Sequence, residues 1–216
     1  MSFTIYRAGP VLDLIGKYEG RSDYDTVWNG IPISMRPDKL TANTVAQVMQ
    51  WQAWWRSKGL ASTAAGKYQI ISTTLKDIVS QMRFDTSRKF DAATQDTMAC
   101  HLLTGRGFQR FLDGKIDSDD MAIGLAKEWA SLPVPHDMQG ASRKIKAGQS
   151  YYAGDGLNAA HASIAEVKQA LAIARERYQT GSGPVPAPAA PAKSSSIATV
   201  IIAIAAALVA YLGLTS

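Results

Sequence analysis

The feature that most constrains this chain is a change of composition near residue 180. Residues 1–179 have the mixed composition of a globular domain, whereas residues 180–196 are mostly Gly, Ser, Pro and Ala, with Lys193 as their only charge. Such a run cannot bury enough apolar surface to fold, and its prolines favour extended polyproline-II backbone. The sequence therefore predicts one folded domain over residues 1–179, followed by a linker over residues 180–196.

The residues after this linker, 197–214, are uncharged and almost wholly apolar. As a helix they would measure about 27 Å, which is enough to cross the hydrocarbon core of a bilayer. A buried core helix is the alternative, but such a helix does not normally follow a proline-rich linker. We therefore predict a transmembrane helix and a membrane partner for this segment. The first residues of the chain lack the apolar core of a signal peptide.

The net charge of +5 favours acidic partners such as cell-wall polymers or lipid headgroups. The Lys and Arg residues are scattered, which argues against nucleic acid as a partner. The single cysteine, Cys100, excludes a disulfide within the chain and lies in an apolar helical pattern typical of a small buried residue. His101, His136 and His161 are too far apart for metal-ligand spacing, so we expect no metal or other cofactor.

The domain has the pattern of a mostly helical α+β fold with one small β region. A first helix is expected to open at residues 9–10, where Gly precedes Pro, and to end at Gly20. A second should begin at Thr44, with Gln47 completing a capping box, and end at Gly59. The small β region is expected at residues 23–30. Further helices are expected from about Ser72, from Asp91 to about Leu103, over residues 121–129 and over residues 158–179.

Glu19 is the candidate for acid–base chemistry. It lies in the last turn of the first expected helix, beside that helix's apolar stripe. Apolar surroundings and the negative end of the helix dipole both raise the pKa of a carboxyl, as a proton donor at neutral pH requires. Position alone leaves a solvated surface role open, because acidic residues near helix ends are common.

Several motifs in a fixed order give Glu19 a context. The chain carries YEG at residues 18–20, YDTV at 24–27, STAAGKYQI at 62–70, Arg106-Gly107, and WASLP at 129–133. This order resembles the lambda-phage type lysozymes, whose loop reads STGAGRYQL and whose late motif is also WASLP. The resemblance implies a lysozyme-like fold and a phage endolysin that cleaves peptidoglycan.

The resemblance also implies a reaction. Members of this family cut the β-1,4 bond between N-acetylmuramic acid and N-acetylglucosamine as lytic transglycosylases, leaving 1,6-anhydro ends. Glu19 would protonate the leaving oxygen and then accept the proton of the sugar's own 6-hydroxyl. A muramidase that hydrolyses the bond would need a second carboxylate, for which Asp23 and Asp25 stay open. A non-catalytic wall-binding membrane protein is the competing class.

Five residues are candidates for substrate binding. Tyr68 and Gln69 lie in the matched loop and would contact sugar or hold Glu19 in place, with packing as the alternative. Asp25 matches the family's strand aspartate, and its alternative role is a hydrogen-bond acceptor at a turn or strand end. Tyr151 and Tyr152, in a glycine-rich aromatic loop, are expected to border the cleft.

The remaining aromatic candidates are tryptophans. Trp51, Trp54 and Trp55 would offer a sugar-stacking face, although two of the three are expected in the core, as is Trp129. Together with the expected anchor, these interpretations predict an enzyme tethered to a membrane, acting on peptidoglycan in the host periplasm, or a component of a virion.

Overall fold

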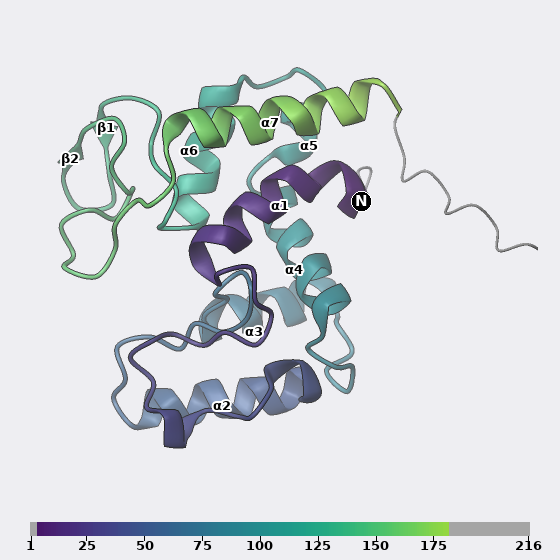
Figure 1. Ribbon diagram of the computed structural model, residues 1–216, viewed down its shortest axis with the longest axis vertical. Coiled ribbons are helices and arrows are strands. Elements are labelled where there is room, and N and C mark those ends of the chain that lie inside the picture. Colours follow the sequence, from purple (N-terminus) through teal and green to yellow (C-terminus); the bar gives the residue numbers. More distant parts are fainter. Residues whose placement is uncertain (1–3, 182–216) are drawn as a thin grey trace, which may run out of the picture. The chain divides into compact units, whose positions relative to one another are not determined.

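The computed structural model describes residues 4–181, which belong to one compact unit spanning residues 1–183 (Figure 1). The predicted transmembrane helix at residues 197–214 and nearly all of the predicted linker lie outside the described residues. Within residues 4–181, no helix is both long enough and apolar enough to cross a membrane.

The described residues are mostly helical with a small antiparallel sheet, which confirms the predicted α+β class. In the sheet, Met138 pairs with Ile145 and Gln139 with Lys144. The elements are α1 (Ile5–Glu19), 3₁₀ turns at Ile33–Met35 and Leu40–Ala42, α2 (Val45–Ser57), α3 (Ser72–Met82), α4 (Ala92–Gly105), α5 (Phe108–Leu112), α6 (Ser118–Glu128), β1 (Met138–Gln139), β2 (Lys144–Ile145) and α7 (Ile164–Gln179).

The helices form two groups joined by α4 (Figure 1). In one group α7 lies along α1, and α5 and α6 pack against α7; in the other, α2 packs against α3. Helix α4 contacts α1, α3 and α5, and its buried face supplies Met98, Ala99 and Leu103 to the core. This arrangement places the C-terminal end of α1 against the loop that joins α2 to α3.

Helix α1 begins earlier than predicted, because Thr4 caps it through a hydrogen bond that its side chain accepts from the Arg7 amide. Pro10 therefore lies inside the helix, where it has no amide hydrogen to donate to the carbonyl of Tyr6. Arg177 of α7 donates to that carbonyl instead, at 3.0 Å. The prediction of a start at residues 9–10 was wrong because Thr4 caps the helix and because Arg177 of α7 replaces the donor that the internal proline lacks.

Other helix boundaries follow the local capping residues. Both bonds of the predicted capping box between Thr44 and Gln47 are present, Asp91 caps α4, and α3 begins at Ser72, all as predicted. The predicted starts of the last two helices were wrong. Helix α6 begins three residues earlier, after Asp117, and α7 begins six residues later, after a capping box of Ser163 with Glu166.

The predicted β region at residues 23–30 forms no strand. The Asp25 amide donates to the side chain of Asp23 at 2.9 Å, which folds this stretch into a turn. Only Val27 makes a bridge, pairing with Ala65 of the loop between α2 and α3. The small sheet of the domain lies instead at residues 138–145.

Candidate active site

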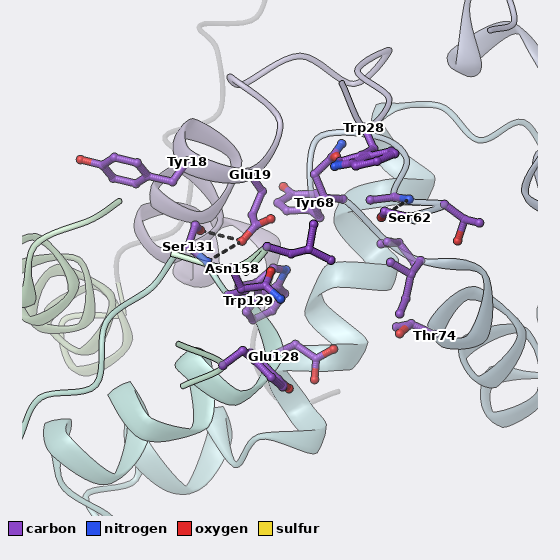
Figure 2. Close-up of a pocket in the computed structure, with 18 of the residues that line it drawn as sticks. Tyr18, Glu19, Trp28, Ser62, Tyr68, Thr74, Glu128, Trp129, Ser131 and Asn158 are labelled. Atoms are coloured by element: carbon purple, nitrogen blue, oxygen red, sulfur yellow. Dashed lines mark hydrogen bonds between the residues drawn. The ribbon is translucent and has the colours of Figure 1, made fainter. Parts of the chain in front are cut away.

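A cleft of about 760 Å³ opens where the two helix groups meet (Figure 2). One wall comes from the end of α2 and the loop leading into α3, and the other from the end of α6 and residues 129–131 and 152–161. The end of α1 and residues 26–29 complete the lining. Its members include Tyr18, Glu19, Arg21, Thr26, Trp28, Arg56, Ser62, Tyr68, Gln69, Ser72, Arg106, Lys127, Glu128, Trp129, Ser131, Tyr152, Leu157, Asn158 and His161.

Glu19, the last residue of α1, is half-buried in this cleft and is held by a residue of the wall that follows α6. The Ser131 hydroxyl donates to Glu19 Oε1 at 2.6 Å, and the Ser131 amide donates to the same oxygen at 3.2 Å (Figure 2). Glu19 Oε2 accepts no hydrogen bond from any described residue. The carboxyl is thus oriented through one oxygen, which leaves the other to carry a proton.

The protonation of Glu19 is set by opposing effects. Burial raises the pKa of the Glu19 carboxyl above its ordinary value, while the two hydrogen bonds from Ser131 and the nearby His161 imidazole act to lower it. Burial dominates, so the protonated form is favoured relative to a solvated carboxyl. This is the direction that a general acid needs at neutral pH.

The loop at residues 62–70 lies directly against the end of α1. A Cβ added to Gly20 would lie 2.5 Å from the Lys67 carbonyl oxygen, so the absence of a side chain permits the approach. The Gly66 amide donates to the Thr26 carbonyl at 2.7 Å, and the Trp28 amide donates to the Ala64 carbonyl at 3.0 Å. These bonds fix one wall of the cleft relative to Glu19.

Two residues predicted from this loop line the cleft with Glu19. Tyr68 is almost fully buried, and its hydroxyl donates to Asp96 at 2.6 Å. Burial and the Asp96 carboxylate raise the pKa of Tyr68, which keeps its hydroxyl protonated. Gln69 has a left-handed backbone with φ of 46°, and its side chain donates to the Gly66 carbonyl at 2.8 Å.

Of the other three predicted substrate-binding residues, one lines the cleft and two do not. Tyr152 lines the cleft and donates its hydroxyl to the Lys127 carbonyl at 2.7 Å. Tyr151 packs edge-on against Tyr152 and is not part of the cleft lining. Asp25 is also outside the lining, and its carboxylate accepts a hydrogen bond from the Thr41 amide at 2.7 Å. Asp25 therefore acts as a hydrogen-bond acceptor, the alternative to substrate binding that the sequence left open.

The cleft also contains residues to which the sequence assigned no role, among them Ser131, Trp28, Glu128 and His161. Ser131 lies within the WASLP motif, but only the fold brings it to Glu19. Trp28 lines the wall with its ring over Gly30, where any Cβ would collide with the ring atoms. Glu128 is a second carboxylate in the lining, and Arg106 donates to it at 2.7 Å. His161, whose spacing from the other histidines argues against a metal site, also lines the cleft.

The predicted tryptophan face does not reach the cleft. Trp55 is fully buried, and its indole donates to the Met35 carbonyl at 2.8 Å. Trp51 packs against Trp54 and Trp55, and neither Trp51 nor Trp54 lines the cleft. Trp129 is buried as predicted, with an edge in the cleft wall.

Burial raises the pKa of the Cys100 thiol to about 12, consistent with a packing role.

An open cleft with a protonatable carboxyl in its wall is typical of enzymes that cleave glycan chains. The family model described as Endolysin matches residues 46–158, just over half of the 216-residue chain, and the chain belongs to this family. Endolysins are phage enzymes that degrade peptidoglycan in host lysis, so peptidoglycan is the substrate class. The match includes the loop at residues 62–70 and Ser131, whereas Glu19 precedes it. No curated protein and no solved structure matches the chain.

Proposed function

We propose that this endolysin is a lytic transglycosylase in which Glu19 is the catalytic acid and base. The observation that carries the proposal is the state of the Glu19 carboxyl: burial raises its pKa, Ser131 holds Oε1, and Oε2 is left for the proton. In the first step Oε2 protonates the leaving glycosidic oxygen. The resulting carboxylate then accepts the proton of the muramic acid 6-hydroxyl as that oxygen attacks the anomeric carbon.

The carboxylates available in the cleft support transglycosylation over hydrolysis. A hydrolysing muramidase places a second carboxylate to activate water or to form a glycosyl intermediate. Apart from Glu19, the acidic residue in the described lining is Glu128, and its carboxylate is engaged by Arg106. Asp23 and Asp25 lie outside the lining and accept backbone hydrogen bonds. An intramolecular 6-hydroxyl attack requires no second carboxylate.

The test is digestion of purified sacculi by the full-length chain, with mass spectrometry of the products. We expect 1,6-anhydro-muropeptides, which Glu19→Gln should abolish while leaving the circular dichroism spectrum unchanged. Asp23→Asn, an exposed acid outside the cleft, is the matched control and should retain activity.

The alternatives give different results in the same assay. Reducing-end muramic acid would make the enzyme a muramidase, and loss of this product in Glu128→Gln would identify the second carboxylate. Sacculi that are bound but left intact would indicate a wall-binding protein. Activity retained by Glu19→Gln would refute the assignment of Glu19.

We further propose that residues 180–196 are a linker and residues 197–214 a membrane anchor, placing the catalytic domain in the host periplasm. The composition of these residues supports this. In membrane fractionation, the full-length chain should sediment with membranes, whereas a chain ending at residue 196 should not. Equal partitioning of both would contradict the anchor.

A further inference from the structure

The charges that line the cleft are not balanced. Its two acidic residues are Glu19 and Glu128. Its four cationic residues are Arg21, Arg56, Arg106 and Lys127. Arg106 pairs with Glu128, and burial favours the neutral form of Glu19. Among the residues the structure describes, Arg21, Arg56 and Lys127 form no ion pair. The cleft therefore presents positive charge without an internal counter-charge.

Arg21 is held at the cleft by an unusual backbone. It follows the end of α1 with φ of 53°, and Ser22 continues the left-handed turn with φ of 60°. The Ser22 amide donates to the Gly16 carbonyl at 2.8 Å, which closes this turn onto the helix. A side chain in this conformation costs about 1 kcal/mol relative to glycine, and such strain tends to persist at functional positions. Glycine would relieve the strain but would remove the cation from the cleft.

The other two cations come from separate elements. Arg56 lies in the last turn of α2, and its guanidinium donates to the Ser72 hydroxyl at the start of α3. Lys127 lies in the last turn of α6, with its ammonium 5.5 Å from the centre of the Tyr151 ring. The positive charge is thus distributed over both walls and the end of α1, along the surface that an extended polymer would contact.

We propose that Arg21, Arg56 and Lys127 bind the carboxylates of the peptides attached to muramic acid, so that the enzyme prefers peptide-bearing glycan strands to bare ones. The sugar backbone is uncharged where the lactyl carboxyl of muramic acid is in amide linkage to a peptide, so the negative charge of a peptide-bearing strand lies mainly in the peptides. Guanidinium groups suit carboxylates because they donate in a bidentate manner. This inference rests on the proposed function, in which the strand occupies this cleft.

The test measures binding apart from cleavage. The full-length Glu19→Gln protein is titrated calorimetrically with glycan fragments that carry peptides and with chitin oligosaccharides of equal length, which are N-acetylated and carry no carboxylate. We expect tighter binding of the peptide-bearing fragments. Arg21→Gln and Arg56→Gln should each reduce that preference about two- to fivefold, the range for solvent-accessible ion pairs. In the Glu19→Gln protein without a second substitution, added salt should also reduce the preference for peptide-bearing fragments.

Two further variants separate charge in the cleft from charge elsewhere. Lys58→Gln removes an equal charge from an exposed residue beside the end of α2 and outside the lining, and should keep the preference. Arg56→Lys retains the charge and should keep most of it. Equal affinity for the two fragments, or an equal loss in Lys58→Gln, would overturn the inference. Failure of the proposed function is distinct, since it shows as missing anhydro products in digested sacculi.

Discussion

Replacement of Gly20 by alanine tests how closely the loop at residues 62–70 is fitted to the end of α1. The new Cβ would lie 2.5 Å from the Lys67 carbonyl oxygen and 2.6 Å from the Lys67 Cα. Both are backbone atoms, so no side-chain rotation can relieve the collision. The backbone of Gly20, with φ of −114°, is open to alanine, and the effect is therefore steric alone.

The size of the effect follows from the overlap. Ordinary contacts begin at 3.4 Å, so the loop must retreat by about 1 Å. Forcing a methyl group into a packed site costs about 2 kcal/mol, which lowers the Tm of a domain of this size by about 4–8 °C. The same shift moves Tyr68 and Gln69 away from Glu19, and a displacement of about 1 Å can reduce kcat about 100-fold.

The assay combines thermal unfolding by circular dichroism with the rate of sacculus digestion. Gly105→Ala at the end of α4 is the matched control, because a Cβ there meets no atom within 4 Å. It should leave stability unchanged or raise it by up to about 1 kcal/mol. A Gly20→Ala protein with the Tm and rate of the wild type would refute the role of this contact.

Three further predictions concern the cleft. Ser131→Ala removes a hydrogen bond that lowers the pKa of Glu19, so the alkaline limb of the kcat/KM profile should move to higher pH. Burial raises the pKa of Glu19 in the folded state, so ionisation of Glu19 destabilises the fold as the pH rises. In urea titrations, Glu19→Gln should therefore be more stable than wild type at neutral pH. This advantage should disappear below the ordinary carboxyl pKa. Trp28→Ala should raise KM for glycan about two- to tenfold through lost ring contact, whereas Trp54→Ala, outside the lining, should not.

Each of these has a contrary outcome. An unchanged or acid-shifted alkaline limb in Ser131→Ala would show that the hydrogen bonds to Oε1 do not control the acid. Equal stability of wild type and Glu19→Gln at every pH would mean that Glu19 is solvated as in the unfolded chain. Matching KM increases in both tryptophan variants would indicate a general packing effect.

Local signals in the sequence determined much of the helical framework. The capping box of Thr44 with Gln47, the cap at Asp91 and the start at Ser72 each depend on atoms within one helical turn, which is why they could be predicted. The placement of Glu19 at the end of α1 came from the same kind of signal together with the order of motifs.

The tertiary structure decided what surrounds Glu19. Ser131 is 112 residues away along the chain and reaches the carboxyl only because the two walls pack around the end of α1. The same packing gives Tyr6 its donor from Arg177, so that α1 tolerates Pro10 and begins at Ile5. The packing also places Trp28 in the cleft lining and leaves Asp25 outside it, where its carboxylate accepts a hydrogen bond from the Thr41 amide. A hydrogen bond between distant residues leaves no local periodicity in the sequence, whereas a helix cap does.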